Sequence, residues 1–177
     1  MYIKNIHIEN FRNFQNTDIP LKKLTIIVGE NDAGKSNLLD AVRLVLNNNG
    51  LAYFSRSLSI TDINKDSVEE FQEYLWNNSA KITEKLNDNA YMKTVYEKIP
   101  VVKVRVTFTD AKTEYQKQLL RDWINLTDDE EVCFEVEYSF APIKLREFIE
   151  ECLFLQDRVD NFMIPVEKYE YRIYSVN

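Results

Sequence analysis

The chain has 177 residues, of which 45% are hydrophobic and 29% are charged, and this balance is typical of one globular domain rather than of a disordered chain. No apolar run approaches the roughly 20 residues that a membrane-spanning helix needs, so no membrane contact is expected. The formal net charge of −7 argues against a domain that wraps nucleic acid with a basic surface, although it leaves room for local patches such as Lys22-Lys23 or Lys103 with Arg105.

The first fifty residues predict a strand, a turn, a second strand and a helix. Residues 2–8 form the first strand, and Asn10-Phe11-Arg12-Asn13-Phe14 turns the chain. The apolar run Leu24-Thr25-Ile26-Ile27-Val28 predicts the second strand. The helix is expected over residues 35–46, and Gly50 is placed near its C′ position.

A complete phosphate-binding motif lies between that strand and that helix. Residues 29–36 read Gly29-Glu30-Asn31-Asp32-Ala33-Gly34-Lys35-Ser36, which is G-x-x-x-x-G-K-[ST] in the strand–loop–helix setting that the motif requires. Backbone N–H groups of the loop and the helix N-terminus favour anions, Lys35 is placed to reach the β- and γ-phosphates, and the Ser36 hydroxyl is placed to ligate Mg²⁺. The motif therefore predicts binding of ATP with Mg²⁺.

The middle of the chain is predicted to be irregular and then helical. We expect no regular structure over residues 51–65. Asp66 is expected to cap a helix whose buried face carries Val68, Phe71 and Leu75. A polar helical stretch with Ile82 and Leu86 follows.

Hydrophobic alternation then predicts strands that are exposed on one face. It covers residues 102–109 and 132–140, and residues 169–176 read as a last strand. Between them we expect a helix over residues 111–125, an acidic turn at residues 128–131, and a helix that opens at Pro142. These patterns predict an α/β fold with a mixed sheet, in which residues 2–8, 101–109 and 132–140 are largely antiparallel beside the strand 24–28.

Several motifs of known nucleotide-binding proteins are missing. No glycine follows Gly50, which removes an LSGGQ-type signature and the D-x-x-G switch of a GTPase, and Asn64-Lys65-Asp66 lacks the N-K-x-D spacing. The nearest match to a Walker B strand is residues 152–157, which we interpret as the core face of a helix. No Arg-rich lid follows the loop, so a small-molecule kinase is disfavoured.

The cysteines and the N-terminus predict a cytoplasmic protein. Cys133 and Cys152 form no C-x-x-C motif and are expected to be reduced and partly buried. The first five residues carry no secretory segment. His7 is the single histidine and has no partner for a metal site.

The first part of the chain resembles the amino-terminal half of an ABC ATPase head of the SMC/RecF type. The residues that carry this likeness are Ile6 and Ile8 with Asn10 to Phe14, then Leu24 to Ser36, then Leu38 to Arg43. Within that class the loop sequence and the segment Leu58-Ser59-Ile60-Thr61-Asp62-Ile63 are similar to the OLD family (overcoming lysogenization defect), which includes the nuclease subunit of the Gabija phage-defence system.

The resemblance implies a nucleotide site and a longer protein. It places Gly29 to Ser36, with Asn37, around the triphosphate and Mg²⁺ and puts Arg12 and Asn13 near the phosphates and ribose, whereas Arg12 read by itself is equally an ordinary turn arginine. Gln116 and Gln156 are both candidates for the Q-loop glutamine. The family's signature motif, Walker B, D-loop and carboxyl-terminal Toprim nuclease have no counterpart here, so residues 1–177 are expected to be the amino-terminal portion of an ATPase domain, or a truncated or split protein.

These considerations give one leading hypothesis and several alternatives. The leading hypothesis is the ATP-binding portion of an OLD-like ATPase–endonuclease that acts on DNA in phage defence, pairs its heads as a homo-oligomer and is accompanied by a helicase-like or other defence partner. It is expected to be an ATPase only within the longer protein or complex. The alternatives are a RecF/SMC-like DNA repair head, an interaction module that docks a partner ATPase and, more remotely, a small-molecule kinase.

Overall fold

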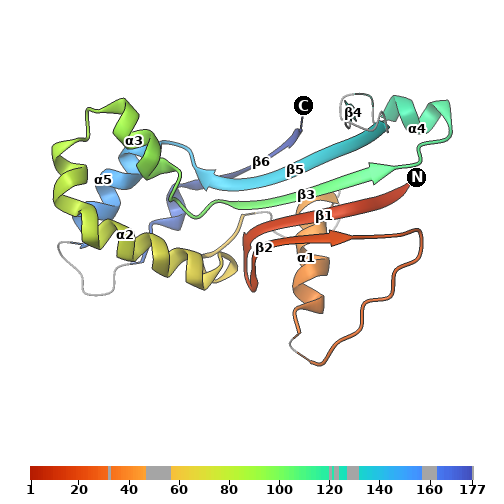
Figure 1. Cartoon of the computed structure of the whole chain (residues 1–177), viewed down its shortest axis with the longest axis horizontal. Helices are drawn as coiled ribbons and strands as arrows, with labels where there is room; N and C mark the ends of the chain where they lie inside the picture. The colour runs from red at the N-terminus through yellow and green to blue at the C-terminus, as the bar shows by residue number, and fades with distance from the viewer. Residues whose placement is uncertain are drawn as a thin grey trace.

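The computed structural model of the chain describes residues 1–31, 33–46, 57–119, 121, 124–126, 132–156 and 163–176. Within these residues the structure has six strands, five α-helices and two short 3₁₀ helices that can be given bounds. Figure 1 shows their arrangement. The strands are β1 (Tyr2–Phe11), β2 (Phe14–Pro20), β3 (Val102–Thr109), β4 (Ile124–Leu126), β5 (Val132–Pro142) and β6 (Tyr169–Ser175). The helices are α1 (Lys35–Leu46), η1 (Ile60–Asp62), α2 (Lys65–Glu84), α3 (Asn89–Tyr96), α4 (Glu114–Leu119), α5 (Leu145–Gln156) and η3 (Val166–Lys168).

The strands form one sheet in which every described pairing is antiparallel. Its order is β2-β1-β3-β5, and the far edge of β5 pairs with β4 near its start and with β6 along the rest. The register aligns side chains of one kind across the sheet, because neighbours on the same face of adjacent strands stand opposite each other. One row is apolar and runs through Ile8, Val104, Tyr138 and Ile173.

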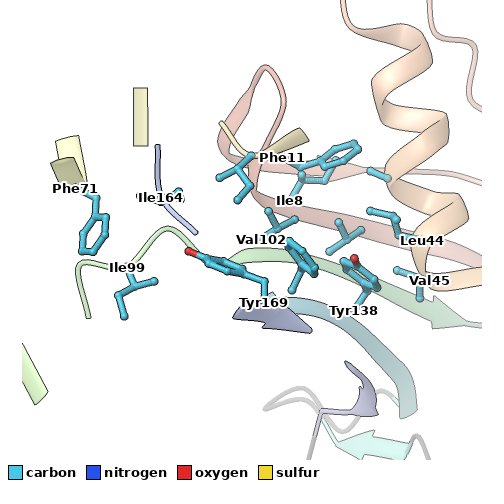
Figure 2. Packing of buried hydrophobic residues seen from close by; sticks show 14 of the residues in the cluster. Ile8, Phe11, Leu44, Val45, Phe71, Ile99, Val102, Tyr138, Ile164 and Tyr169 are labelled. Carbon is cyan, nitrogen blue, oxygen red and sulfur yellow. The ribbon is translucent and has the colours of Figure 1, made fainter. Parts of the chain in front are cut away.

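Helix α1 covers the apolar face of this sheet. Its side chains Leu38, Ala41, Leu44 and Val45 are buried, and they recur at the three- and four-residue spacing of one helical face. Figure 2 shows Leu44 and Val45 turned toward the side chains of the sheet, near Tyr138. This packing fixes α1, and with it the loop from which α1 emerges, relative to β1 and β3.

The other long helices gather at one end of the sheet (Figure 1). Phe71 of α2 stacks on Phe148 of α5 with ring centroids 6.1 Å apart, and Tyr169 at the start of β6 meets Phe148 edge-on at 5.4 Å. The Tyr169 hydroxyl donates a hydrogen bond to the carbonyl of Pro100 at 3.2 Å. A second part of the core is therefore aromatic and ties α2, α5 and β6 together.

The opposite face of the sheet is polar, and the charges at its centre are paired. His7 lies 3.1 Å from Asp18 and 2.9 Å from Glu9, and Lys103 donates to Glu9 at 2.8 Å. Arg105 contacts Glu137 at 2.8 Å. Lys103 and Arg105, one of the local basic patches left open by the sequence, are therefore matched by carboxylates and do not form an unopposed cationic surface.

The predicted elements agree with the structure in most of the sheet and in α1. The strands expected over 2–8, 102–109, 132–140 and 169–176 and the helix over 35–46 are present, and the α/β class is confirmed. The acidic turn at 128–131 and Gly50 fall outside the described residues. Strand β2 was not predicted, because its polar residues give only a weak alternation and its order comes from pairing with β1.

Three predicted boundaries are wrong for local reasons. The cap of α2 is Asn64 and not Asp66, because the Asn64 side chain accepts from the Ser67 N–H at 3.1 Å. The helix expected over 111–125 is only the short α4, after which residues 124–126 pair with β5. Pro142 ends β5 rather than opening α5, since it still pairs with Tyr169.

The strand predicted over residues 24–28 is also wrong for this structure. Residues 21–30 adopt no regular secondary structure, and Leu24, Ile26, Ile27 and Val28 are 82%, 78%, 46% and 85% exposed. The sequence pattern is that of a strand, but a strand needs a neighbour to satisfy its N–H and C=O groups. No described strand pairs with this segment, and in Figure 1 it extends away from the sheet before entering α1.

Candidate nucleotide-binding site

The predicted phosphate loop leads directly into α1. Helix α1 begins at Lys35, and its first turn carries no acidic residue. The first N–H groups of an α-helix have no partner within the helix, and the helix dipole adds positive potential at that end. The start of α1 is therefore suited to an anion.

The backbone of the loop favours glycine at Gly34. Gly34 has φ +86°, a left-handed conformation that side chains disfavour. A Cβ built on Gly34 would lie 2.4 Å from Nδ2 of Asn13, whereas one on Gly29 would lie 3.1 Å from the Cβ of Ala33, a contact that a small shift of Ala33 relieves. The loop thus keeps its turn at Gly34 only without a side chain there.

The Lys35 side chain of the motif bends back onto the loop. The Lys35 ammonium donates to the carbonyl of Gly29 at 2.7 Å and to that of Glu30 at 2.5 Å. These oxygens carry no full charge, so a phosphate oxygen is a stronger acceptor for the same ammonium. Ser36 is exposed beside it. Glu30, Asn31 and Ala33 are exposed in the loop, and Asp32 lies outside the described residues.

The turn between β1 and β2 lies against the first turn of α1. Asn37 donates from Nδ2 to Oδ1 of Asn13 at 2.7 Å, and the Asn13 amide packs over Gly34. Arg12 donates from Nη1 to Oδ1 of Asn37 at 3.0 Å. The structure therefore brings Arg12 and Asn13 to the same helix end as the phosphate loop, where they contact Asn37, which is 25 and 24 residues further along the chain.

Arg12 is held by two carboxylates. It donates from Nη1 to Asp40 at 2.8 Å and from Nε to Asp62 at 2.9 Å. Burial by itself would lower the pKa of Arg12, but the hydrogen bonds with Asp40 and Asp62 outweigh it and raise that pKa. Burial would likewise raise the pKa of Asp62, yet hydrogen bonds from Ser59 and Arg12 leave it lowered. Arg12 and Asp62 are thus held in their charged forms.

Asp40, Asp62 and Asn64 are site residues that the sequence did not single out. Asn64 donates from Nδ2 to the carbonyl of Arg12 at 2.7 Å, and the Arg12 N–H donates to the carbonyl of Asp62 at 2.9 Å. The available signals were that Asp40 and Asp62 belong to segments 38–43 and 58–63, which were used for the family resemblance. The contact of Asp62 with Arg12 spans fifty residues, which no local pattern reports.

The two Q-loop candidates lie in other surroundings. Gln116 belongs to α4, where its side-chain oxygen accepts from the N–H of Lys112 at 3.0 Å and of Thr113 at 3.4 Å. Gln156 is buried at the end of α5. Neither contact set involves the phosphate loop, so the Q-loop assignment stays a prediction.

The described residues lack two features that would change the chemistry of the site. No group of three or more His, Cys, Asp or Glu there is arranged to hold a metal ion. None of the described helices has the length and apolar character needed to cross a bilayer. The assignment of Ser36 to Mg²⁺ stays a prediction from the motif.

Comparison with known families decides the class of the protein. The family model described as AAA ATPase domain (AAA_15) matches residues 1–171. The chain belongs to this AAA ATPase domain family. Membership indicates nucleotide binding and agrees with the loop at the start of α1.

Curated relatives match shorter parts of the chain. It is 37% identical over 70 residues to the DNA replication and repair protein RecF of Rickettsia typhi, a stretch that covers 39% of this chain and 18% of that protein. It is 36% identical over 83 residues to the Retron Ec83 probable ATPase of Escherichia coli, covering 45% and 14%. An ATP/GTP phosphatase of Helicobacter pylori is 56% identical over 41 residues, covering 23% and 11%. The matched stretches thus span less than a fifth of each of these relatives.

Proposed function

We propose that this chain is the ATP·Mg²⁺-binding portion of a DNA-related ATPase. The observation that carries the proposal is the loop geometry, in which Gly34 has a positive φ, Lys35 reaches into the loop, and α1 presents its N-terminus. The similarity of the first part of the chain to RecF supports a role connected with DNA.

The loop residues divide the work of binding a triphosphate. Backbone N–H groups over residues 29–37 hold the phosphate oxygens, and Lys35 exchanges its carbonyl contacts for the β- and γ-phosphates. The Ser36 hydroxyl would hold Mg²⁺, which would supply positive charge to offset the negative charge of the phosphates. Arg12 and Asn13 border this site through Asn37 and Gly34.

We further propose that the exposed segment 24–28 becomes a strand when the site is completed by other parts of the protein or by a partner. Its four large apolar side chains are exposed here, and burial of each is worth roughly 1.5–3 kcal/mol. The ATP site needs residues from those other parts, or from a partner, to reach catalytic geometry. Residues 1–177 alone should therefore bind ATP but hydrolyse it at a negligible rate, because positioned groups that stabilise the transition state are required in addition to the loop.

For the whole protein, the finer proposal is an OLD-like endonuclease in phage defence whose cleavage is regulated by nucleotide. It rests on the form of residues 29–36 and 58–63. A RecF-like repair ATPase is the second candidate, and the RecF similarity favours it. Both functions place the protein in the cytoplasm, with paired heads as the expected oligomer.

One experiment separates the two candidates. The product of the complete reading frame is incubated with plasmid DNA, Mg²⁺ and varied ATP, and cleavage is compared with that by Lys35→Ala. Cleavage that depends on metal-binding carboxylates and changes with ATP only in the wild type supports the nuclease proposal. Binding of DNA and ATP without any cleavage would replace it with the repair role.

A further inference from the structure

Asp62 lies outside the phosphate-binding motif, and both of its carboxylate oxygens accept hydrogen bonds, one from Ser59 and the other from Arg12. Oδ2 accepts from the N–H of Ser59 at 3.1 Å and from its hydroxyl at 2.8 Å. Oδ1 accepts from Nε of Arg12 at 2.9 Å. The first pair of bonds fixes the carboxylate on the η1 turn, so its remaining oxygen is a stationary acceptor for Arg12.

Arg12 connects this acceptor to the helix that follows the phosphate loop. Its Nη1 donates to Asn37 and to Asp40, in the first two turns of α1. Asp40 is shared with Arg43, which contacts its other oxygen at 2.8 Å. Asp62 is therefore the partner that holds Nε while Nη1 faces α1, and Asp40 alone does not determine where the guanidinium lies.

The backbone at Arg12 indicates that this placement has a role beyond forming the turn. Arg12 has φ +48° at the first position of the two-residue turn between Phe11 and Phe14, where glycine is the residue that turns usually favour. A left-handed non-glycine residue costs on the order of 1 kcal/mol, and such strain concentrates at functional sites. The turn is also anchored from the other side, because Phe11 forms a bridge with Ile63.

We propose that Asp62 is a positioning residue for the nucleotide site, and that it acts through Arg12. It holds the guanidinium in the one orientation that also fixes Asn37, and Asn37 in turn holds Asn13 over Gly34. Without Asp62, the Arg12 guanidinium can move with Asp40 and change its orientation. The first turn of α1, where phosphate is bound, then becomes less rigid. This inference rests on the proposed binding of ATP at residues 29–37.

A merely structural ion pair would behave differently. The Asp62 and Arg12 side chains are 20% and 32% exposed, and partly exposed pairs of this kind usually contribute only about 0–1 kcal/mol to folding. A structural role thus predicts a small loss of stability and no change in ATP affinity. A positioning role predicts weaker ATP binding at nearly unchanged stability.

The test compares variants of the protein expressed from its complete reading frame. ATP·Mg²⁺ affinity is measured by calorimetry and the unfolding temperature by scanning fluorimetry. The variants are Asp62→Asn and Lys35→Ala, with Glu151→Gln as the control. Glu151 lies on the distant helix α5, and its carboxylate is 2.9 Å from the Lys168 ammonium. We expect Asp62→Asn to weaken ATP binding roughly tenfold, as when a residue that orients a ligand group is lost, and Glu151→Gln to leave it unchanged.

Coupling to Arg12 is tested in the double variant. If Asp62 acts through Arg12, Asp62→Asn adds no further loss of affinity once Arg12→Gln is present, because the two changes remove one interaction. Asp62→Glu keeps the charge but shifts the carboxylate by one methylene, and it should also weaken ATP binding at an unchanged unfolding temperature. This variant decides the matter if Asp62→Asn does not fold.

The outcomes distinguish this inference from the proposed function. If Lys35→Ala loses ATP binding while both Asp62 variants keep wild-type affinity, the positioning role is wrong and the ATP site stands. Additive losses in the Arg12→Gln background would also overturn it. If Lys35→Ala binds ATP as the wild type does, the proposed function fails.

Discussion

The amide of Asn13 fills the space into which a side chain at Gly34 would project. The ideal Cβ of Gly34 lies 2.4 Å from Nδ2 of Asn13 and 3.1 Å from its Cγ. Both residues lie beside α1, one in the β1–β2 turn and the other in the phosphate loop. The turn and the loop are therefore fitted to each other, and a change in one requires movement of the other.

Gly34→Ala should disturb the loop more than the fold. The new methyl group meets Asn13, and the backbone at φ +86° becomes strained by about 1–3 kcal/mol. We expect weaker ATP binding, while the cooperative unfolding transition remains. In Gly34→Ala with Asn13→Ala the collision is removed but the φ strain is not, so affinity should recover only in part. Full affinity in Gly34→Ala alone would contradict this fit.

Phe148→Ala should destabilise the whole protein. Phe148 is fully buried and contacts the rings of Phe71 and Tyr169. Truncation of such a core aromatic typically costs about 3–5 kcal/mol in the free energy of unfolding. Phe154→Ala on the same helix is the matched control, because Phe154 is 51% exposed and should cost far less. Equal losses for both variants in urea unfolding would refute the assignment of this core.

His7 should stabilise the fold at low pH. Burial opposes its charged form, but hydrogen bonds and charge interactions with Glu9 and Asp18 outweigh burial and raise the pKa of His7. A raised pKa in the folded state contributes stability that is fully present below the unfolded value near 6.5 and is lost as the pH rises through the folded value.

The pH dependence is checked by comparing wild type with His7→Gln in urea unfolding at pH 5.5 and pH 8. The advantage of the wild type, no more than about 1 kcal/mol for so exposed an ion-pair network, should be larger at the lower pH. An advantage that grows as the pH rises would show that the carboxylates do not favour the charged imidazole.

The sequence predicts the local parts of the structure well and the long-range contacts poorly. The bounds of helix α1 agree with the sequence pattern Leu38, Leu39, Val42 and Leu46, although Leu39 and Leu46 are exposed in the structure. The loop follows from two glycines and a lysine at fixed positions. The contact of Arg12 with Asp62 depends on how the β1–β2 turn meets the η1 turn, and residues far apart in the chain leave no local pattern. Segment 24–28 has the composition of a strand, but its structure depends on neighbours that the described residues do not supply.

The role of Lys35 tests the central claim most directly. ATP·Mg²⁺ binding by the wild-type protein is measured by calorimetry and compared with Lys35→Ala and with the control Lys65→Ala, whose side chain is 83% exposed on α2. Because the hydrogen bonds of the Lys35 ammonium to described residues go to loop carbonyls, its removal should leave the unfolding temperature almost unchanged. We predict that Lys35→Ala abolishes ATP binding and that Lys65→Ala preserves it. Equal ATP affinity in the wild type and Lys35→Ala would contradict the account.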